Sequence, residues 1–278
     1  MQVKNKWLLG MVVCCLMALS TSLCFAQQQA SRKLTAEQMA QRALDFQEVQ
    51  NLMSRHEYYH TLGKNKEELL DIWVTKSPYT ETAKFSMNPG SMIGMKSIMY
   101  QYGEFHETSN KIELELLSKV RSDIANVPEN LGVGQLMLHN LTTGCIEVAG
   151  DGKTAKGMWY SPGAMASVDP VTGKPQQVWM WERYAADFVK EDGQWKIWHL
   201  LICTDFGGDW PKKAEGGPGA TTVGNEATFA GPPPQIAAIQ PKLDVYNDNY
   251  KEYSPTKVPQ NVPRPPEPYY TFSETFSY

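Results

Sequence analysis

The chain has 278 residues, a formal net charge of −4 at pH 7, and 42% hydrophobic and 20% charged residues. The sequence contains no basic stripe, which argues against nucleic-acid binding, because that function depends on neutralising phosphates. The spacing of the five cysteines matches no zinc or iron–sulfur pattern.

The N-terminal segment has the features of a secretory signal peptide. Lys4 and Lys6 precede an uncharged apolar run over residues 7–20, and Cys24 and Ala26 occupy the two positions that a signal peptidase reads. The run, at about 14 residues, is shorter than the roughly 20 that span a bilayer. We therefore expect cleavage near Ala26, a secreted or periplasmic location, no stable membrane span after cleavage, and a mature charge of 24 − 30 = −6.

Two cysteines, Cys145 and Cys203, remain after this cleavage. They permit one disulfide in an oxidising compartment. Both lie in expected core strands, so we interpret them as small buried apolar residues.

A polar tether over residues 27–33 leads into the expected helices. Thr35 with Gln38 three residues later predicts a helix start, and Gly63 suits the end of this helix near residue 62. Residues 65–73 predict a second helix, residues 82–86 a short strand and residues 94–107 a third helix. Helix and loop are expected up to Gly134.

Alternating apolar residues from Leu136 to Phe206 predict an antiparallel, strongly curved meander. Two turns, at residues 150–153 and 191–194, contain Asp-Gly, which tolerates the positive φ of tight hairpins. A Pro/Gly-containing break separates the run that ends at Gly163 from the run that starts at Gln177. Residues 34–210 are thus expected to form one domain.

The remaining residues, 211–278, have a different composition. Residues 211–234 are rich in Gly and Pro and predict an extended loop. Residues 246–278 combine many prolines with aromatic residues, whereas disordered tails are poor in aromatics. We expect an ordered, irregular strap on the domain or on a partner subunit; a proline-rich recognition tail is the alternative.

This order of elements resembles the nuclear transport factor 2-like cone fold. Within that superfamily it is similar to the SnoaL-like family, with its scytalone dehydratase, polyketide cyclase and bile-acid dehydratase relatives. The matching segments lie between about residues 36 and 206 and are residues 52–55, 69–73, 139–142, 146–148, 150–152, 154–155, 159–160, 184, 188 and 192–197. The resemblance implies an α+β cone in which a curved antiparallel sheet packs against N-terminal helices, with an extended C-terminal strap. It also implies a pocket between the first helix and the sheet, but it does not fix the reaction.

Enzymes of this family place a Tyr/Asp pair on the first helix and a histidine on the first meander strand. His139 matches the strand histidine, whereas His56 stands at the tyrosine position and Thr61 at the aspartate position. An imidazole, with an ordinary pKa of about 6.5, is suited to act as the base. The resulting catalytic candidates are His139 as base, His56 or His60 as acid partner, and Tyr59 or Tyr160 as donor to a developing oxyanion.

Aromatic residues on the meander strands are the substrate-binding candidates. Such residues are common in a core, and a flat cyclic ligand also stacks on them. Strand alternation places Trp179 and Trp181 on one face and Glu182 and Tyr184 on the other. The full candidate set is Trp159, Trp179, Trp181, Glu182 and Tyr184.

Residues 56–60 also satisfy the HExxH pattern of zinc hydrolases. His56 and His60 lie four residues apart on one helix face, with Glu57 between them. No third ligand motif follows, so a zinc hydrolase is an alternative and no metal site is predicted.

Together these features predict an exported protein that binds a small apolar or aromatic cyclic molecule. The expected chemistry is cofactor-free proton transfer of a lyase or isomerase, leading to dehydration, isomerisation or cyclisation. The missing first-helix aspartate favours the alternative, a non-catalytic ligand-binding module. A homodimer through the convex face of the sheet is expected from the resemblance.

Overall fold

The computed structural model describes residues 34–209, 232–246, 256, 258 and 262–278. The expected signal peptide, the tether up to residue 33 and most of the Gly/Pro-rich loop lie outside the described residues. The chain divides into two compact units, residues 1–44 and 45–278. In the first unit, Thr35 N donates to Gln38 Oε1 (2.9 Å) and Gln38 N donates to Thr35 Oγ1 (3.2 Å), which confirms the predicted helix cap.

The first helix agrees with the prediction, and the next two differ from it in length. The second helix ends at Asp71, two residues early, because Trp73 forms a bridge with strand residue Ile197. The third continues through a π-helical segment to Val120. The helices are α2 (Ala36–Thr61), α3 (Asn65–Asp71), α4 (Tyr79–Thr82), α5 (Met95–Ile98), η1 (Met99–Glu104), α6 (Phe105–Val120), η2 (Pro128–Asn130), α7 (Pro234–Ala237) and η3 (Phe272–Glu274). Within the part of the chain that is described, no helix is both long and apolar enough to span a membrane.

The predicted meander forms most of one mixed sheet with the order β3-β5-β6-β7-β1-β2-β8, and β4 also pairs with β5. Both predicted turns are present, with φ of 69° at Gly152 and 80° at Gly193. The expected first strand is two strands, β3 and β4, and β5 extends to Val168, so the expected break is shorter than predicted. The strands are β1 (Lys84–Met87), β2 (Gly90–Ile93), β3 (Leu136–His139), β4 (Thr142–Val148), β5 (Thr154–Val168), β6 (Pro175–Glu191), β7 (Gln194–Asp209) and β8 (Val245–Tyr246).

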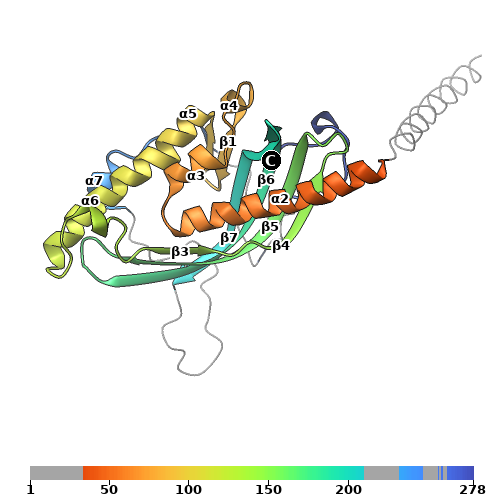
Figure 1. Ribbon diagram of the computed structural model, residues 1–278. Coiled ribbons are helices and arrows are strands. Elements are labelled where there is room, and N and C mark those ends of the chain that lie inside the picture. The colour runs from red at the N-terminus through yellow and green to blue at the C-terminus, as the bar shows by residue number, and fades with distance from the viewer. Residues whose placement is uncertain (1–33, 210–231, 247–255, 257, 259–261) are drawn as a thin grey trace, which may run out of the picture. The chain divides into compact units, whose positions relative to one another are not determined.

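The main core lies between one face of this sheet and the helices, with the part of α2 from Asp45 onward running across β5 and β6 (Figure 1). From Asp45 onward, α2 contributes Val49 and Met53, which pack with Trp73 and Phe188 in one buried cluster. Full burial of such side chains contributes about 1.5–3 kcal/mol each. We call the sheet face that carries Phe188 the inner face and the opposite one the outer face.

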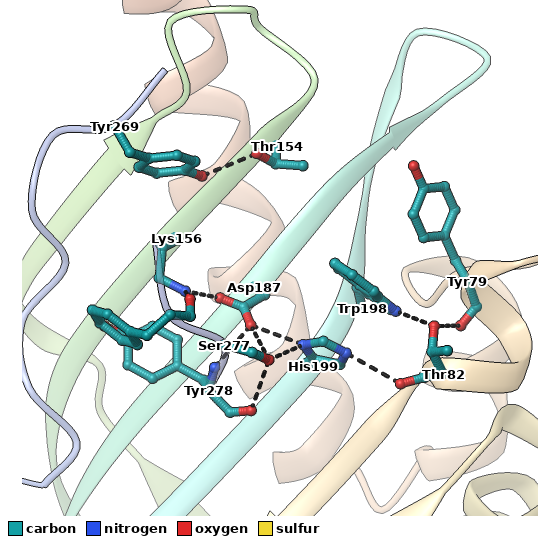
Figure 2. A network of polar contacts seen from close by, with 11 residues as sticks. Tyr79, Thr82, Thr154, Lys156, Asp187, Trp198, His199, Tyr269, Ser277 and Tyr278 are labelled. Atoms are coloured by element: carbon teal, nitrogen blue, oxygen red, sulfur yellow. Dashed lines mark hydrogen bonds and ion pairs between the residues drawn. The ribbon is translucent and has the colours of Figure 1, made fainter. Parts of the chain in front are cut away.

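The predicted C-terminal strap is confirmed for residues 262–278, which cover part of the outer face (Figure 2). Residues 247–255, 257 and 259–261 of the predicted strap lie outside the described residues. Tyr269 and Thr154 share a hydrogen bond between their hydroxyl groups (3.1 Å), and Gly150 N donates to Tyr269 O (3.0 Å). Tyr278 packs with Met158 and Ala185 on this face. The strap is therefore bonded both to the β4–β5 turn and to the centre of the sheet.

A buried ion pair lies beneath the strap. Lys156 contacts Asp187, and the Lys156 ammonium is 4.3–5.2 Å from the ring centroids of three strap aromatics. Asp187 Oδ2 also accepts from Tyr278 N (2.9 Å) and contacts His199 Nδ1 (2.8 Å). Burial raises the pKa of Asp187, but the His199 hydrogen bond and the Lys156 charge outweigh it and hold that pKa below its ordinary value. The three aromatic residues are Phe272, Phe276 and Tyr278.

Candidate functional site

Helix α2 directs His56 into a buried polar network. His56 Nδ1 donates to Glu68 Oε1 (2.8 Å), which also accepts from Trp73 Nε1 (3.0 Å). Glu68 Oε2 accepts from the Tyr102 hydroxyl (3.0 Å). Burial lowers the pKa of His56, but the negative charge of Glu68 and its hydrogen bond outweigh burial and raise this pKa above the ordinary value.

One turn later on α2, His60 contacts both the other histidines and Tyr102. Its ring centroid lies 5.9 Å from that of His56 and 4.9 Å from that of His139, the latter in an edge contact. His60 Nδ1 is 3.0 Å from the Tyr102 hydroxyl oxygen. Burial, followed by the charges of the neighbouring histidines, holds the pKa of His60 well below its ordinary value.

Strand β3 ends with His139, whose ring faces the inner side of the sheet. His139 pairs with Gly163, where an added Cβ would lie only 3.1 Å from His139 Nδ1, so glycine leaves room for the ring. His139 Nδ1 is 2.9 Å from Glu182 Oε2. Glu182 Oε1 accepts from Thr204 Oγ1 (2.7 Å), which orients this carboxylate.

Glu57 supplies a carboxylate to this cluster. Both of its carboxylate oxygens are buried, and no described residue hydrogen-bonds to them. Burial raises the pKa of Glu57 to about 7, against the charges of His56 and His139, which lower it. A buried carboxyl group that titrates near neutral pH beside histidines is typical of acid/base sites.

Five of the residues predicted from the sequence therefore come together. Tyr184 lies between two of the histidines, with ring centroids 5.8 Å from His56 and 6.2 Å from His139. Burial raises the pKa of Tyr184 well above its ordinary value, so its hydroxyl stays protonated. The five residues are His56, His60, His139, Glu182 and Tyr184. We call these five and Glu57 the acid/base cluster.

The structure does not bring the other candidates to this cluster. Tyr160 pairs with Arg183, and strand alternation from Tyr184 puts Tyr160, Trp179 and Trp181 on the outer face. Trp159 lies in the core, where its Nε1 donates to Gln50 (3.1 Å). The hydroxyl of Tyr59 donates to Asp71 Oδ2 (2.8 Å).

Sequence reasoning missed three members of this environment. The sequence marks Glu57 only as part of the HExxH pattern, and it does not mark Glu68 or Tyr102 as site residues. Their common signal is a charged or hydroxyl residue in a helical segment that packs on the pocket wall. The sequence does not show that these helices meet, so the signal was insufficient by itself.

A cavity of about 390 Å³ reaches the cluster at His60. It lies between the end of α2, helix α6 and strand β3, and its wall combines charged Glu107 and Lys111 with apolar Met137. A second cavity of about 740 Å³ shares Asn110, Gln135 and Met137 with it. Both volumes are in the range of small-molecule sites.

In the HExxH segment, His56 Nδ1 contacts Glu68 and His60 Nδ1 contacts Tyr102. Zinc-binding histidines commonly make such contacts through the ring nitrogen that does not bind the metal, so the question is whether enough ligands meet. Among the described residues, no group of three or more His, Cys, Asp or Glu side chains is arranged to hold a metal ion.

A serine, a histidine and an aspartate also meet under the strap (Figure 2). Ser277 Oγ and Asp187 Oδ2 both contact Nδ1 of His199, at 2.9 and 2.8 Å, while its Nε2 faces Thr82 O at 3.1 Å. A catalytic triad needs the serine and the aspartate on opposite ring nitrogens. This group is therefore a structural network.

Comparison with solved structures gives similar chains at low sequence identity. A putative scytalone dehydratase from Novosphingobium aromaticivorans is 16% identical over 62% of this chain and 91% of its own, with a TM-score of 0.40. LinA is 13% identical over 65% of this chain and 99% of its own (TM-score 0.44). A putative dehydratase of the NTF2-like family from Streptomyces avermitilis is 14% identical over 59% and 97% (TM-score 0.43). At these values the likeness says nothing about function.

No curated protein matches the chain. The family model of the SnoaL-like domain matches residues 41–200, which is more than half of the chain and contains the entire acid/base cluster. The chain belongs to the SnoaL-like family.

Proposed function

We propose that this protein binds a small cyclic molecule in the cavity at His60 and catalyses cofactor-free proton transfer on it, as a dehydratase, isomerase or cyclase. The single observation that carries the proposal is Glu57, a buried carboxyl group with a pKa of about 7. Burying such a group without hydrogen-bond partners costs stability, so a fold tolerates it where it has a use.

The cluster contains the groups that this chemistry needs. His139 and Glu182 form a histidine–carboxylate pair at 2.9 Å, and Glu57 holds or releases a proton near neutral pH. The protonated hydroxyl of Tyr184 is a donor beside them. General acid/base groups with pKa values near the working pH contribute about 10²–10⁴-fold to a rate.

The ring opening of 5-nitrobenzisoxazole tests this proposal, because it needs only a base. The base removes the ring C–H proton, the C–H electron pair forms the nitrile, and the N–O bond breaks to give a coloured phenolate. We expect turnover that rises with pH through about 7, because ionised Glu57 stabilises the positive charge that forms on the histidine that takes the proton. Glu57→Gln should lower the rate about 10²-fold, and Glu48→Gln, an exposed position of the same helix, should not change it. A wild-type rate equal to that of buffer would count against the proposal.

A non-catalytic binding module is the second candidate. Burial supports this candidate, because the nitrogens of His139 and the oxygens of Glu57 are buried while the cavity meets the cluster at His60. Saturable binding of 5-nitrobenzisoxazole without turnover in any variant would favour this candidate.

We also propose export and self-association. Export is supported by the N-terminal sequence. Mass spectrometry of the secreted fraction tests it, and we expect the mass of a chain that starts near Gln27.

The strap occupies the outer face around Lys156, so a dimer through the sheet would use the part around Leu138 and Tyr160, which are 38% and 40% exposed. Light scattering on wild type and Leu138→Glu tests this arrangement.

A further inference from the structure

His60 differs from the other members of the acid/base cluster in its position. It lines the 390 Å³ cavity, and its ring is also in edge contact with His139, which lies behind it. A ligand in this cavity would therefore meet His60 before the other histidines.

The hydrogen bonds of Tyr102 determine which ring nitrogen of His60 carries the proton. The Tyr102 hydroxyl has one hydrogen, and the Glu68 carboxylate, 3.0 Å away, can only accept it. The Tyr102 oxygen must then accept from its other neighbour, His60 Nδ1, at 3.0 Å. His60 is thus the Nδ1–H tautomer, and its Nε2 carries the lone pair.

The protonation states of the three groups agree with this assignment. Burial, the charge of Glu68 and its hydrogen bond raise the pKa of Tyr102 well above its ordinary value, so the hydroxyl keeps its hydrogen. Burial and neighbouring histidines keep the pKa of His60 well below its ordinary value, so its ring is neutral at pH 7. No described residue hydrogen-bonds to Nε2 of His60. The titratable groups that face His60 or share its cavity are His56, His106, His139, Tyr102, Glu67, Glu107 and Lys111.

We propose that Tyr102, held by Glu68, is a positioning residue that fixes the tautomer of His60, and that His60 Nε2 exchanges the proton with the ligand. This inference rests on the proposed function and names the residue that acts first in it. In the dehydratase form of the proposed function, the ligand is a cyclic molecule with an acidic C–H next to a carbonyl and a hydroxyl leaving group.

The reaction step conserves atoms and charge. His60 Nε2 takes the proton from the ligand carbon, and the C–H electron pair forms the new double bond. The C–O bond breaks, the hydroxyl leaves with its electron pair, and the imidazolium returns the proton to give water. Nδ1 keeps its hydrogen bond to Tyr102 throughout, so the ring does not rotate between the two transfers.

Nitrogen NMR of the ¹⁵N-labelled full chain tests the tautomer without a ligand, because long-range ¹H–¹⁵N spectra distinguish protonated from unprotonated ring nitrogens. We expect a protonated Nδ1 and an unprotonated Nε2 for His60 at pH 7. Tyr102→Phe should give a mixture of tautomers. Tyr100→Phe, which changes a 52% exposed tyrosine in the same π-helical segment, should leave the wild-type spectrum unchanged.

Kinetics with 5-nitrobenzisoxazole test the proton exchange. Tyr102→Phe should lower kcat about tenfold with little change in KM, and His60→Gln should lower kcat by about 10²-fold. A wild-type His60 that is protonated at Nε2 would overturn the assignment whatever the rate. A His60→Gln variant as fast as wild type would overturn the proton exchange. If wild type has the stated tautomer but shows no turnover, the role of Tyr102 is supported and only the proposed function is contradicted.

Discussion

His60 and His139 lie in edge contact, with ring centroids 4.9 Å apart, although one comes from helix α2 and the other from strand β3. The first lines the cavity, and the second is paired with the Glu182 carboxylate. The contact joins an accessible imidazole to a buried histidine–carboxylate pair. The charge of His139 is one of the causes that lower the pKa of the cavity-lining His60.

Replacing Glu57 should stabilise the protein in a pH-dependent way. Its folded-state pKa of about 7 lies above the ordinary value of 4.5, so the folded state binds the proton more tightly and wild-type stability falls as pH rises between these values. At about 1.4 kcal/mol per pKa unit, Glu57→Gln should raise the free energy of unfolding by about 3 kcal/mol at pH 8 and by less at pH 5. Urea unfolding at both pH values measures this difference. Equal gains at the two values, or the same gain in Glu48→Gln, would contradict the assignment.

Removing the hydroxyl that orients Glu182 should affect both stability and proton transfer. Thr204 Oγ1 donates to Glu182 Oε1 at 2.7 Å, so Thr204→Val leaves one oxygen of this carboxylate without its donor. We expect a loss of about 1–3 kcal/mol in stability and an altered pH–rate profile for 5-nitrobenzisoxazole. Thr204→Ser keeps the hydroxyl and should restore both. If Thr204→Ser behaves like Thr204→Val, the loss of the hydroxyl is not the cause of the changes in stability and pH–rate profile.

The buried Lys156 should be essential for the strap. Lys156→Met leaves Asp187 as a buried charge without its cation and removes the contacts with three aromatic rings, so we expect a loss of about 3–5 kcal/mol. Hydrogen exchange of residues 262–278 should accelerate in the same variant. Lys153→Met, at an exposed position of the β4–β5 turn, is the matched control and should change neither quantity.

The pH dependence of Asp187 gives a separate test of this ion pair. Its folded-state pKa is depressed, so its contribution is present above its unfolded pKa of about 3.9 and is lost as pH falls through the lower folded value. Asp187→Asn should therefore be less stable than wild type at pH 7, and the difference should shrink below about pH 4. A difference that stays constant down to pH 2 would contradict the depressed pKa.

Local features of the sequence predicted much of this architecture. The capping pair of Thr35 and Gln38, the two Asp-Gly turns and the alternation in the strands depend on neighbouring residues only, and all are present. The sequence does not predict strand β2, which pairs with β1 across a short turn at residues 88–89 and with β8 from a distant part of the chain.

The candidate site was predicted less completely, for the same reason. Alternation correctly separated Trp181 from Tyr184, but it could not tell which face meets the helices. Glu57 follows His56 directly, and only the packed structure shows that its carboxylate is buried beside His139. Glu68 and Tyr102 come from two further helical segments, whose contact with His60 depends on tertiary packing.

Carbon-13 NMR titration of the Glu57 side-chain carboxyl tests the acid/base cluster most directly, because it follows the proton on the group that carries the proposal. We expect a midpoint near pH 7 in the full chain. A midpoint at or below about 4.5, the value of an ordinary glutamate, would contradict the account.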